Sequence, residues 1–377
     1  MKARVLQLSK YYFPYIGGIE NTCKQLVDYL PEYESAVVCF NENKNDVVEK
    51  IDGAKVYRVG TKINISRQAL SFSYFPVLKK ALKEFDPNII HFHWANPYPA
   101  FVLLSMIPKK AKLVVHYHMD IINQKKIYPF VKPVEKALLK RADLILVTSP
   151  NYKTGSLPLQ PFTGKIKVLP SAMDEGKFSL RSSDEENIAK VKARYGGRKI
   201  VFFVGRHIQY KGLPYLIEAE KYVKGECEIV VAGSGPLTEE LKSACHSERV
   251  HFVGRLSDDE LRWHHYAASV FAFPSITKNE AFGVALAEAM YCKTPAVTFT
   301  IPGSGVNWVN LDGVTGIEVP NGDAKAFAQA IDRLLADDVL AAQYAEAGRQ
   351  RVIDNFTIEP MINKLRSYYD SLIISVE

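Results

Sequence analysis

Residues 200–236 read IVFFVGRHIQYKGLPYLIEAEKYVKGECEIVVAGSGP, and this stretch decides the fold. Two runs rich in β-branched and apolar residues, 200–204 and 227–232, flank a helical window, and a glycine follows each run. A strand, a helix and a second strand in this order predict two parallel strands joined by a right-handed crossover. The stretch therefore indicates an α/β fold with a parallel sheet.

The same alternation runs through all 377 residues, and the strands form two sets of six. This pattern predicts two doubly wound, Rossmann-like domains, residues 1–172 and 173–357, followed by a last helix from about Ile358 to Ser375. Ligands of such sheets bind at the carboxyl ends of the strands, so we expect the active site in a central cleft that both domains face. The expected strands are Val5–Leu8, Ala36–Phe40, Ile89–His93, Leu113–His118, Leu144–Thr148, Ile166–Leu169, Ile200–Val204, Cys227–Ala232, Val250–Val253, Val270–Pro274, Ala296–Thr300 and Ile317–Val319, with helical windows at Ile19–Leu30, Tyr74–Phe85 and Val131–Arg141.

The positive charge of the chain is concentrated in its first half. Residues 1–170 contain 25 Lys and Arg against 13 Asp and Glu, whereas residues 171–377 contain 23 against 28. Two basic stretches, Lys62–Lys83 and Lys125–Arg141, interleave cations with apolar side chains, as a segment at an anionic membrane surface does. They fit equally well as solvated helix faces over a core. No nucleic-acid-binding motif accompanies the charge, so we expect no nucleic-acid partner.

Several absent motifs narrow the class of protein. There is no P-loop, no G-x-G-x-x-G after the first strand, no H-E-x-x-H and no G-x-S-x-G, which disfavours P-loop nucleotidases, dehydrogenases, zinc proteases and α/β-hydrolases. No two aspartates stand two positions apart, so we expect arginine, lysine and backbone N–H groups to hold any phosphate, without a metal ion or cofactor. The five cysteines form no C-x-x-C pair, and neither a signal peptide nor a membrane-spanning run is evident. These observations predict a cytoplasmic protein.

Glycine turns at the ends of three expected strands carry the first site candidates. Arg206 directly follows Gly205, Lys211 comes shortly after, and two cations at a strand end suit a diphosphate. Taken alone, they could also be a basic pair that flanks a helix. The turns after the next two strands add backbone that could face a planar base, at Gly233, Gly254, Arg255 and Leu256.

Two glutamates in residues 279–289, NEAFGVALAEA, give the sharpest signal. Glu280 and Glu288 stand eight positions apart, the second on a helix expected to begin near Phe282. At about 1.5 Å per residue they would lie about 12 Å apart along the helix axis, which matches a sugar at one end and a ribose at the other. The alternative is two ordinary helix glutamates. The helix would open with N–H groups that suit a phosphate, those of Gly283, Val284 and Ala285.

Residues 200–323 resemble the donor-binding half of the retaining family 4 glycosyltransferases, which have the GT-B fold. The resemblance rests on the order and spacing of G-R-x4-K-G (205–212), A-G-x-G-P (232–236), F-V-G-x-L (252–256), F-P-S-x4-E-A-F-G-x4-E-A (273–289) and P-N-G-D (320–323). It implies that Arg206 and Lys211 bind the donor diphosphate and that Glu288 binds the ribose. It also places Glu280 beside the transferred sugar, where the backbone from Phe282 onward holds sugar and phosphate.

The first half resembles the other half of that family. Gly17 and Gly18 follow the first strand, like the family's glycine loop near the donor phosphates. His118 ends the strand at 113–118 and is similar to a histidine that contacts the donor sugar near the reacting carbon. The resemblance makes residues 1–172 the acceptor-binding domain, onto which the helix at 358–377 crosses back, and 173–357 the donor-binding domain.

Four histidines on two strands allow a second interpretation. Strand alternation places His91 with His93, and His116 with His118, on one face. Four imidazoles could bind zinc, but no nearby cysteine or suitably placed carboxylate completes such a site. We expect instead that His91 and His93 lie on the acceptor side of the cleft, with Trp94 and Tyr98 offering faces for sugar rings.

The resemblance implies a retaining, metal-independent hexosyltransferase that uses a nucleotide-diphospho-sugar, with GDP-mannose favoured over UDP-hexoses. The expected acceptor is a saccharide or a lipid-diphosphate-linked saccharide of polysaccharide or lipopolysaccharide-type biosynthesis. The basic first domain would then dock on the anionic inner face of the cell membrane as a peripheral protein. Two alternatives are a nucleotide-sugar 2-epimerase, which shares the two-domain fold, and a non-catalytic nucleotide-sugar-binding module.

Overall fold

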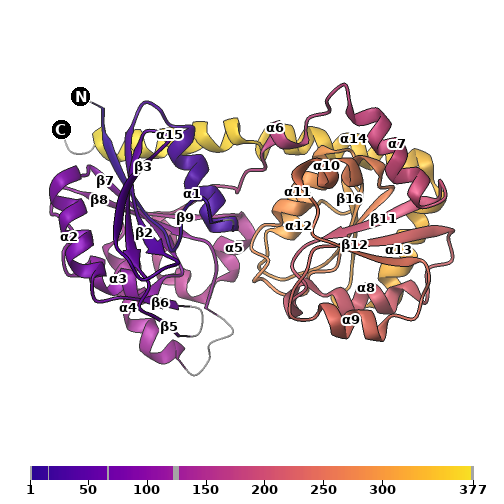
Figure 1. Cartoon of the computed structure of the whole chain (residues 1–377), viewed down its shortest axis with the longest axis horizontal. Helices are drawn as coiled ribbons and strands as arrows, with labels where there is room; N and C mark the ends of the chain where they lie inside the picture. The colour runs from indigo at the N-terminus through magenta and orange to yellow at the C-terminus, as the bar shows by residue number, and fades with distance from the viewer. Residues whose placement is uncertain (1, 16, 66–67, 122–126, 375–377) are drawn as a thin grey trace. The chain divides into compact units, whose positions relative to one another are not determined.

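The computed structural model describes residues 2–15, 17–65, 68–121 and 127–374 (Figure 1). The chain divides into two compact units, which are residues 1–170 with 359–377, and residues 171–358. Each unit contains its own mainly parallel sheet. The acceptor and donor roles assigned to the two parts of the chain stay predictions.

The second unit is built on a six-stranded parallel sheet with the order β13-β12-β11-β14-β15-β16. This is the doubly wound order, in which the direction of winding reverses between the first strand, β11, and the fourth, β14. Ligands bind outside the carboxyl ends of the strands at such a reversal. The strands are β11 (Lys199–Val204), β12 (Cys227–Ala232), β13 (Val250–Gly254), β14 (Val270–Phe273), β15 (Ala296–Phe299) and β16 (Gly316–Val319).

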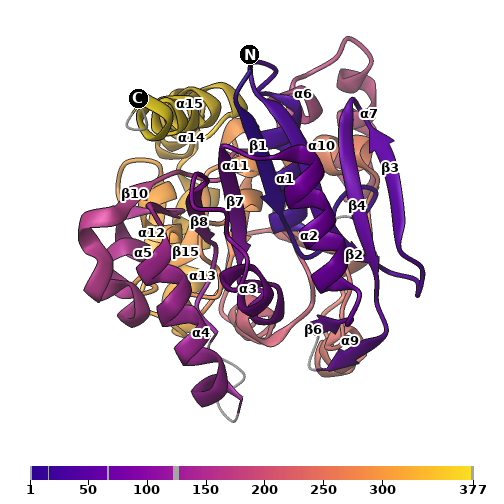
Figure 2. The ribbon, with the colours of Figure 1, turned by 90° about the vertical axis from the view of Figure 1, so that its left-hand side faces the viewer.

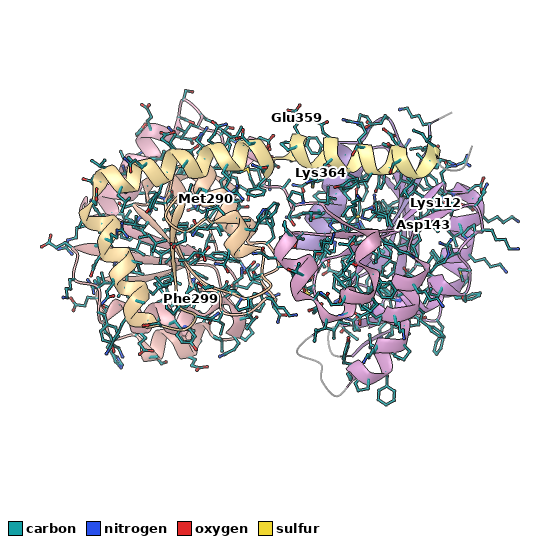
Figure 3. The ribbon with its side chains drawn as sticks, turned by 180° about the vertical axis from the view of Figure 1, so that it is seen from behind. Lys112, Asp143, Met290, Phe299, Glu359 and Lys364 are labelled. Carbon is teal, nitrogen blue, oxygen red and sulfur yellow. The ribbon has the colours of Figure 1, made fainter. Side chains whose placement is uncertain are left out.

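Helices and short 3-10 turns connect these strands, and their ends follow local sequence signals. Ser257 and Glu260 form a capping box at the start of α10, and Asp323 accepts a hydrogen bond from the Ala326 N–H at the start of α13. Met290 of α11, labelled in Figure 3, packs against α14, where its side chain lies next to Gly348. The elements are α6 (Glu175–Phe178), α7 (Asp184–Arg194), η2 (Gln209–Lys211), α8 (Leu213–Glu220), α9 (Thr238–Ala244), α10 (Asp258–Ala267), α11 (Val284–Tyr291), α12 (Val306–Val309), α13 (Ala324–Ala336) and α14 (Asp338–Asn355).

The first unit has an eight-stranded sheet with the order β10-β9-β8-β7-β1-β2-β4-β3, in which only β3 is antiparallel (Figure 2). Its winding reverses between β1 and β7. The strands are β1 (Arg4–Leu8), β2 (Glu34–Asn41), β3 (Val47–Ile51), β4 (Ala54–Gly60), β7 (Ile89–Trp94), β8 (Lys112–Tyr117), β9 (Leu144–Val147) and β10 (Ile166–Val168), with a separate hairpin of β5 (Ile63–Ile65) and β6 (Gln68–Leu70).

The helices of this unit cover both faces of the sheet. Tyr369 of α15 contacts His91 on one face, whereas Glu135 of α4 accepts a hydrogen bond of 2.7 Å from the Tyr117 hydroxyl on the other. None of the described helices is long and apolar enough to cross a bilayer. The helices are α1 (Gly18–Asp28), α2 (Tyr74–Phe85), α3 (Pro97–Leu104), α4 (Tyr128–Arg141), α5 (Pro150–Gly155), η1 (Leu157–Lys165) and α15 (Ile358–Ile374).

The four strands β3 to β6 were not expected from the sequence. β3 and β4 pair through a two-residue turn, and Asp52 and Gly53 both adopt positive φ there. An Asp-Gly pair is the usual sequence signal for such a hairpin turn. The basic stretch Lys62–Lys83 therefore contains a hairpin as well as α2, while the stretch Lys125–Arg141 begins outside the described residues and continues into α4.

Candidate active site

The loops after β11 and β14 meet at the reversal of the second sheet, where Lys211 and Glu280 form an ion pair. The Ser275 hydroxyl also donates to the same carboxylate oxygen, at 3.2 Å. Both charged side chains are nearly buried, with 13% and 11% of their surfaces exposed. Burial acts to lower the pKa of Lys211, but the Glu280 carboxylate outweighs it and the pKa is raised. Lys211 is therefore a fixed positive charge at this point.

Glycine allows these two loops to approach each other. Gly212 has a φ of +66°, and a Cβ at this position would lie 1.8 Å from the Pro274 carbonyl oxygen. One residue before Lys211, the carbonyl of Tyr210 accepts a 3.0 Å hydrogen bond from the Ile276 N–H. These backbone contacts fix the position of Lys211 relative to the loop that carries Glu280.

The three glycine turns expected at strand ends lie side by side. The Gly205 N–H donates to the Ala232 carbonyl at 3.2 Å, and the Gly233 N–H donates to the Gly254 carbonyl at 2.6 Å. A Cβ at Gly233 would lie 1.9 Å from the Gly205 carbonyl oxygen, so only glycine fits there. The three turns are therefore joined by backbone hydrogen bonds at the carboxyl edge of the sheet.

Two arginines of these turns remain accessible. The Arg206 side chain is exposed and makes no ion pair within the described part of the chain. The exposed Arg255 donates to the Ser234 hydroxyl at 3.2 Å, and Leu256 beside it is half-buried. Arg206 is thus an exposed cation that is available to a ligand.

Helix α11 begins at Val284, two residues later than expected, with Gly283 at a φ of +93° as its N-cap. No side chain caps this end, and the first N–H groups of a helix, here including those of Val284 and Ala285, have no acceptor within it. The end is therefore suited to bind an anion. The Phe282 ring is buried against Trp308 and Phe356 and anchors the start of the helix.

The start of α11 corrects the expected spacing of the two glutamates. Glu280 lies in the loop before the helix, so the helical rise does not give its distance from Glu288. Glu288 itself lies on α11 and makes no hydrogen bond with another described residue through its side chain. Burial raises its pKa to about 7, although Lys177 and Lys211 act in the opposite direction. The Glu288 carboxyl can therefore still accept a hydrogen bond from a ligand or donate one to it.

A serine that the sequence did not single out supports the Glu280 loop. The Ser304 hydroxyl donates to the Glu280 carbonyl, and the Gly305 N–H donates to the Ala281 carbonyl at 3.0 Å. Both donors lie in the loop between β15 and α12. The sequence gave no signal that this stretch holds Glu280.

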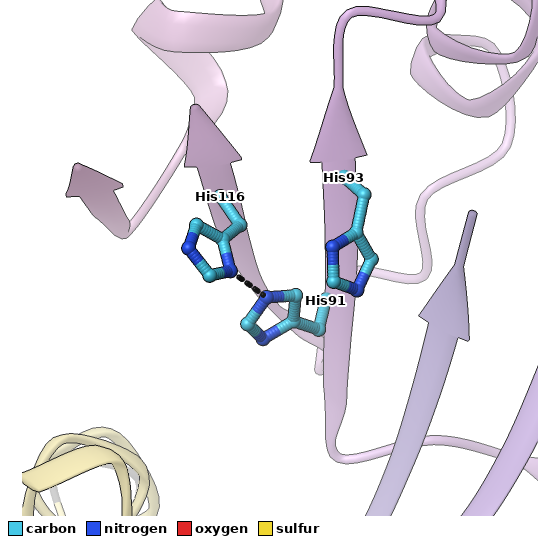
Figure 4. Close-up of side chains that lie close together, drawn as sticks. All are labelled: His91, His93 and His116. Atoms are coloured by element: carbon cyan, nitrogen blue, oxygen red, sulfur yellow. Dashed lines mark hydrogen bonds between the residues drawn. The ribbon is translucent and has the colours of Figure 1, made fainter. Parts of the chain in front are cut away.

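In the first unit, His91 and His93 of β7 and His116 of β8 gather on one face of the sheet (Figure 4), and His118 follows directly after β8. His91 Nε2 and His116 Nδ1 are 3.2 Å apart, and His93 Nδ1 and His118 Nε2 are 2.9 Å apart. Burial lowers the pKa of all four imidazoles, that of His116 to about 3. They are therefore neutral at pH 7.

The structure does not support an open sugar-binding face at the end of β7. His91, His93 and Trp94 are at most 1% exposed. The Trp94 ring stacks on Tyr117 with its centroid 6.1 Å away, and the Tyr98 hydroxyl donates to the Ser71 carbonyl at 2.6 Å. Alternation along the strand had indicated which residues share a face, but not that helices cover both faces.

The glycine loop after β1 opens helix α1. Gly17 is the N-cap, and a Cβ there would lie 2.2 Å from a Glu20 carboxylate oxygen. Gly18 is exposed. The loop therefore has space for a ligand at Gly18. The phosphate contact expected there stays a prediction.

Three of the histidines are close enough to hold a metal ion. The ligand atoms of His91, His93 and His116 lie within 4.8 Å of one another, and this group contains no carboxylate or thiolate. A divalent ion there would have to replace the hydrogen bonds that His91 makes with Tyr369 and that His93 makes with His118 and Gln7. The expectation that no metal takes part in the reaction stays a prediction.

Two successive doubly wound units, each with its own mainly parallel sheet, define the fold class as GT-B. The chain belongs to the group 1 glycosyltransferases, because the model of "Glycosyl transferases group 1" matches residues 184–351 and that of "Glycosyltransferase Family 4" matches residues 16–177. The fold class and the family expected from the sequence are both confirmed.

Similar proteins support this assignment. The chain is 29% identical to an O-antigen chain mannosyltransferase of Escherichia coli, over 99% of both chains. It is 30% identical to the D-rhamnosyltransferase WbpZ of Pseudomonas aeruginosa, over 87% of this chain and 85% of that one. The fold is similar to that of a sucrose-phosphate synthase of Thermosynechococcus elongatus, with a TM-score of 0.83, 22% identity and coverage of 99% and 100% of the two chains.

Proposed function

We propose that this glycosyltransferase moves a hexose, with retention of configuration and without a metal ion, from a nucleoside diphosphate sugar to a saccharide or a lipid-diphosphate-linked saccharide. The observation that carries the proposal is the reversal point of the second sheet. There the buried Lys211, the exposed Arg206 and the uncapped start of α11 supply positive charge and N–H donors at strand ends. A diphosphate is the ligand that these groups suit.

In the proposed reaction the bond between the sugar C1 and the diphosphate oxygen breaks while the acceptor oxygen bonds to C1 on the same face. The acceptor proton passes to an oxygen of the departing diphosphate. Arg206, Lys211 and the first N–H groups of α11 stabilise the charge that develops on this leaving group. Glu280, already paired with Lys211, binds the transferred sugar, and Glu288 binds the ribose.

The choice of sugar rests on similarity. The Escherichia coli relative, which covers nearly the whole chain, is named as a mannosyltransferase. Mannose is therefore the first sugar to test, with GDP as the favoured nucleotide and UDP-hexoses next. The names of the Escherichia coli relative and of the rhamnosyltransferase relative also favour polysaccharide or lipopolysaccharide-type biosynthesis.

The acceptor side of the proposal includes a peripheral membrane location. Helices α2, α3 and α4 of the first unit lie next to one another and expose large aromatic side chains among lysines. Phe72 before α2, Phe101 of α3 and Phe130 of α4 are 93%, 63% and 81% exposed. Exposed aromatic side chains next to cations fit the interface of an anionic bilayer.

A thermal-shift panel of nucleotides and nucleotide sugars, with chelator present, tests the donor. A ligand at a hundred times its Kd stabilises the native state by about 2.7 kcal/mol. Stabilisation by GDP and GDP-mannose supports the proposal. Stabilisation by UDP alone would indicate a UDP-sugar as the donor. No response to any nucleotide would contradict the proposed function.

Turnover assays separate the alternative functions. Transfer to an added acceptor, with the anomeric configuration of the product read by NMR, supports the transferase. Conversion of the donor sugar without an acceptor would indicate the epimerase, and binding without either reaction would indicate a binding module.

A further inference from the structure

Gln7 lies at the centre of the histidine cluster. It is the last residue but one of β1, directly opposite His91 of β7, and it is 1% exposed. Its Oε1 atom is 3.0 Å from Nε2 of His93, whose Nδ1 is in turn 2.9 Å from Nε2 of His118. A hydrogen-bonded chain thus leads from the buried Gln7 to His118, directly after the end of β8.

The chemistry of these groups fixes where each proton lies. A neutral imidazole has one N–H and one lone pair, and an amide oxygen can only accept. His93 Nε2 must therefore donate to Gln7, which leaves His93 Nδ1 as an acceptor. His118 Nε2 must then donate to His93, which leaves a lone pair on His118 Nδ1.

The other end of the Gln7 amide makes no hydrogen bond within the described part of the chain, because its buried Nε2 atom has no partner there. This side chain also acts to lower the pKa of the Tyr369 hydroxyl of α15, which burial raises. Among the described residues, the one hydrogen bond of the amide is therefore the one that its Oε1 atom accepts from His93. Tyr369 lies 2.6 Å from His91 Nδ1, so the same amide adjoins both histidines of β7.

We propose that Gln7 is a positioning residue that sets the tautomers of His93 and His118, so that His118 presents an accepting Nδ1 to a sugar hydroxyl. No hydrogen bond within the described part of the chain uses this Nδ1 atom. It is also not among the fully buried polar atoms that lack a partner. The assignment of the sugar hydroxyl rests on the proposed function, whereas the tautomers do not.

A Gln7→Met variant removes both ends of the amide while keeping its length. The buried His93 would then lose its acceptor at Nε2, and its proton would move to Nδ1 to donate to His118. His118 would become a donor at Nδ1 and would face a sugar hydroxyl in the wrong tautomer. We expect kcat/KM to fall at least about tenfold, because an interaction of about 1.4 kcal/mol or more is lost.

Nitrogen-15 NMR of the histidine side chains, which distinguishes the Nδ1–H from the Nε2–H form, tests the tautomers directly. The wild-type protein should show His93 and His118 as Nε2–H, Gln7→Met should show the other form, and Gln7→Glu, which keeps an accepting oxygen, should restore the wild-type pattern. A wild-type His118 in the Nδ1–H form would overturn the inference. So would a stoichiometric metal ion bound to these histidines in the purified protein.

Activity supplies the second readout. Gln7→Met should lower turnover with the nucleotide sugar while leaving the affinity for the nucleotide alone unchanged, and Gln7→Glu should recover at least part of the rate. Unchanged turnover in a Gln7→Met protein with the altered tautomer would overturn the positioning role. If the wild-type protein transfers no sugar, the NMR result still decides the tautomers, and only the proposed function fails.

Discussion

Lys211 and Glu280 lie 69 residues apart in sequence and form an ion pair where the winding of the second sheet reverses. Each side chain follows a different strand, β11 or β14, so neither loop alone creates the pair. Because both side chains are nearly buried, each one neutralises the charge of the other where water is largely excluded. The pair therefore links stability to the proposed diphosphate site.

Replacing Lys211 by Met should destabilise the protein by about 3 kcal/mol, because it leaves the Glu280 carboxylate buried without its main partner. The double variant Lys211→Met/Glu280→Gln should recover at least half of that loss, because the unpaired charge is gone. Urea unfolding of the two single variants and the double variant measures the coupling. Additive losses would show that the ion pair contributes nothing to folding.

Arg206→Ala should separate activity from stability. The side chain is exposed and has no ion pair to lose, so the free energy of unfolding should change by no more than about 0.5 kcal/mol. If it binds the diphosphate, kcat/KM should fall by about a hundredfold or more. Arg333→Ala, at an exposed arginine of α13, is the matched control and should keep wild-type kinetics. Equal kinetics in the two variants would remove Arg206 from the site.

Gly212→Ala should be more destabilising than a change at an unconstrained glycine. The new Cβ would need the Pro274 carbonyl to move, and alanine would also have to adopt a positive φ. A loss above about 2 kcal/mol is expected from unfolding by urea. Gly197→Ala, with a φ of +71° and no atom within 4 Å of its Cβ, isolates the conformational cost of about 1 kcal/mol. Similar losses at both positions would mean that the Pro274 loop yields easily.

The sequence predicted the parts of the fold that depend on local pattern. The strands at 200–204 and 227–232 appear as β11 and β12 because buried parallel strands are continuous apolar runs. The edge strand Val47–Ile51 was missed, since it is mostly exposed and mixes valines with charged residues. Its Asp52-Gly53 turn was the signal that could have revealed it.

The sequence could name candidate site residues, but not their contacts. It measured the spacing of Glu280 and Glu288 by the rise of a helix, whereas Gly283 adopts a left-handed conformation, the helix begins after it, and Glu280 lies in the preceding loop. It also treated Lys211 and Glu280 as separate ligands of the donor, because only the tertiary structure brings them together. The burial of Trp94 was not predictable for the same reason: α3 and α4 cover that face of the sheet.

Exposed phenylalanines of the first unit should govern vesicle binding. Phe101→Ser/Phe130→Ser should weaken binding to vesicles that contain anionic lipid by about tenfold or more, because a buried aromatic side chain contributes about 1.5–3 kcal/mol. Val339→Ser, at a residue of α14 that is 70% exposed, is the control. Sedimentation with anionic and neutral vesicles measures both effects. Wild-type protein that sediments with neither would contradict the membrane location.

Glu288 should make both stability and nucleotide binding depend on pH. Its pKa is about 7 in the folded protein and about 4.3 in an unfolded chain, so the folded state holds the proton more tightly. Stability should therefore fall as the pH rises from about 4.5 to 7 and stay low above that range. Glu288→Gln removes this loss, and should be more stable than the wild type by about 3–4 kcal/mol at pH 8 but not at pH 4.5.

A bound ribose should reverse the preference of Glu288, because two hydroxyl donors favour the ionised carboxylate. Nucleotide affinity of the wild type should then increase between pH 6 and pH 8, with release of a proton on binding. Isothermal titration calorimetry in two buffers of different ionisation enthalpy measures that proton. Glu288→Gln should bind more weakly, without the increase and without the proton. A wild-type affinity that is flat across this pH range would show that the ribose does not contact Glu288.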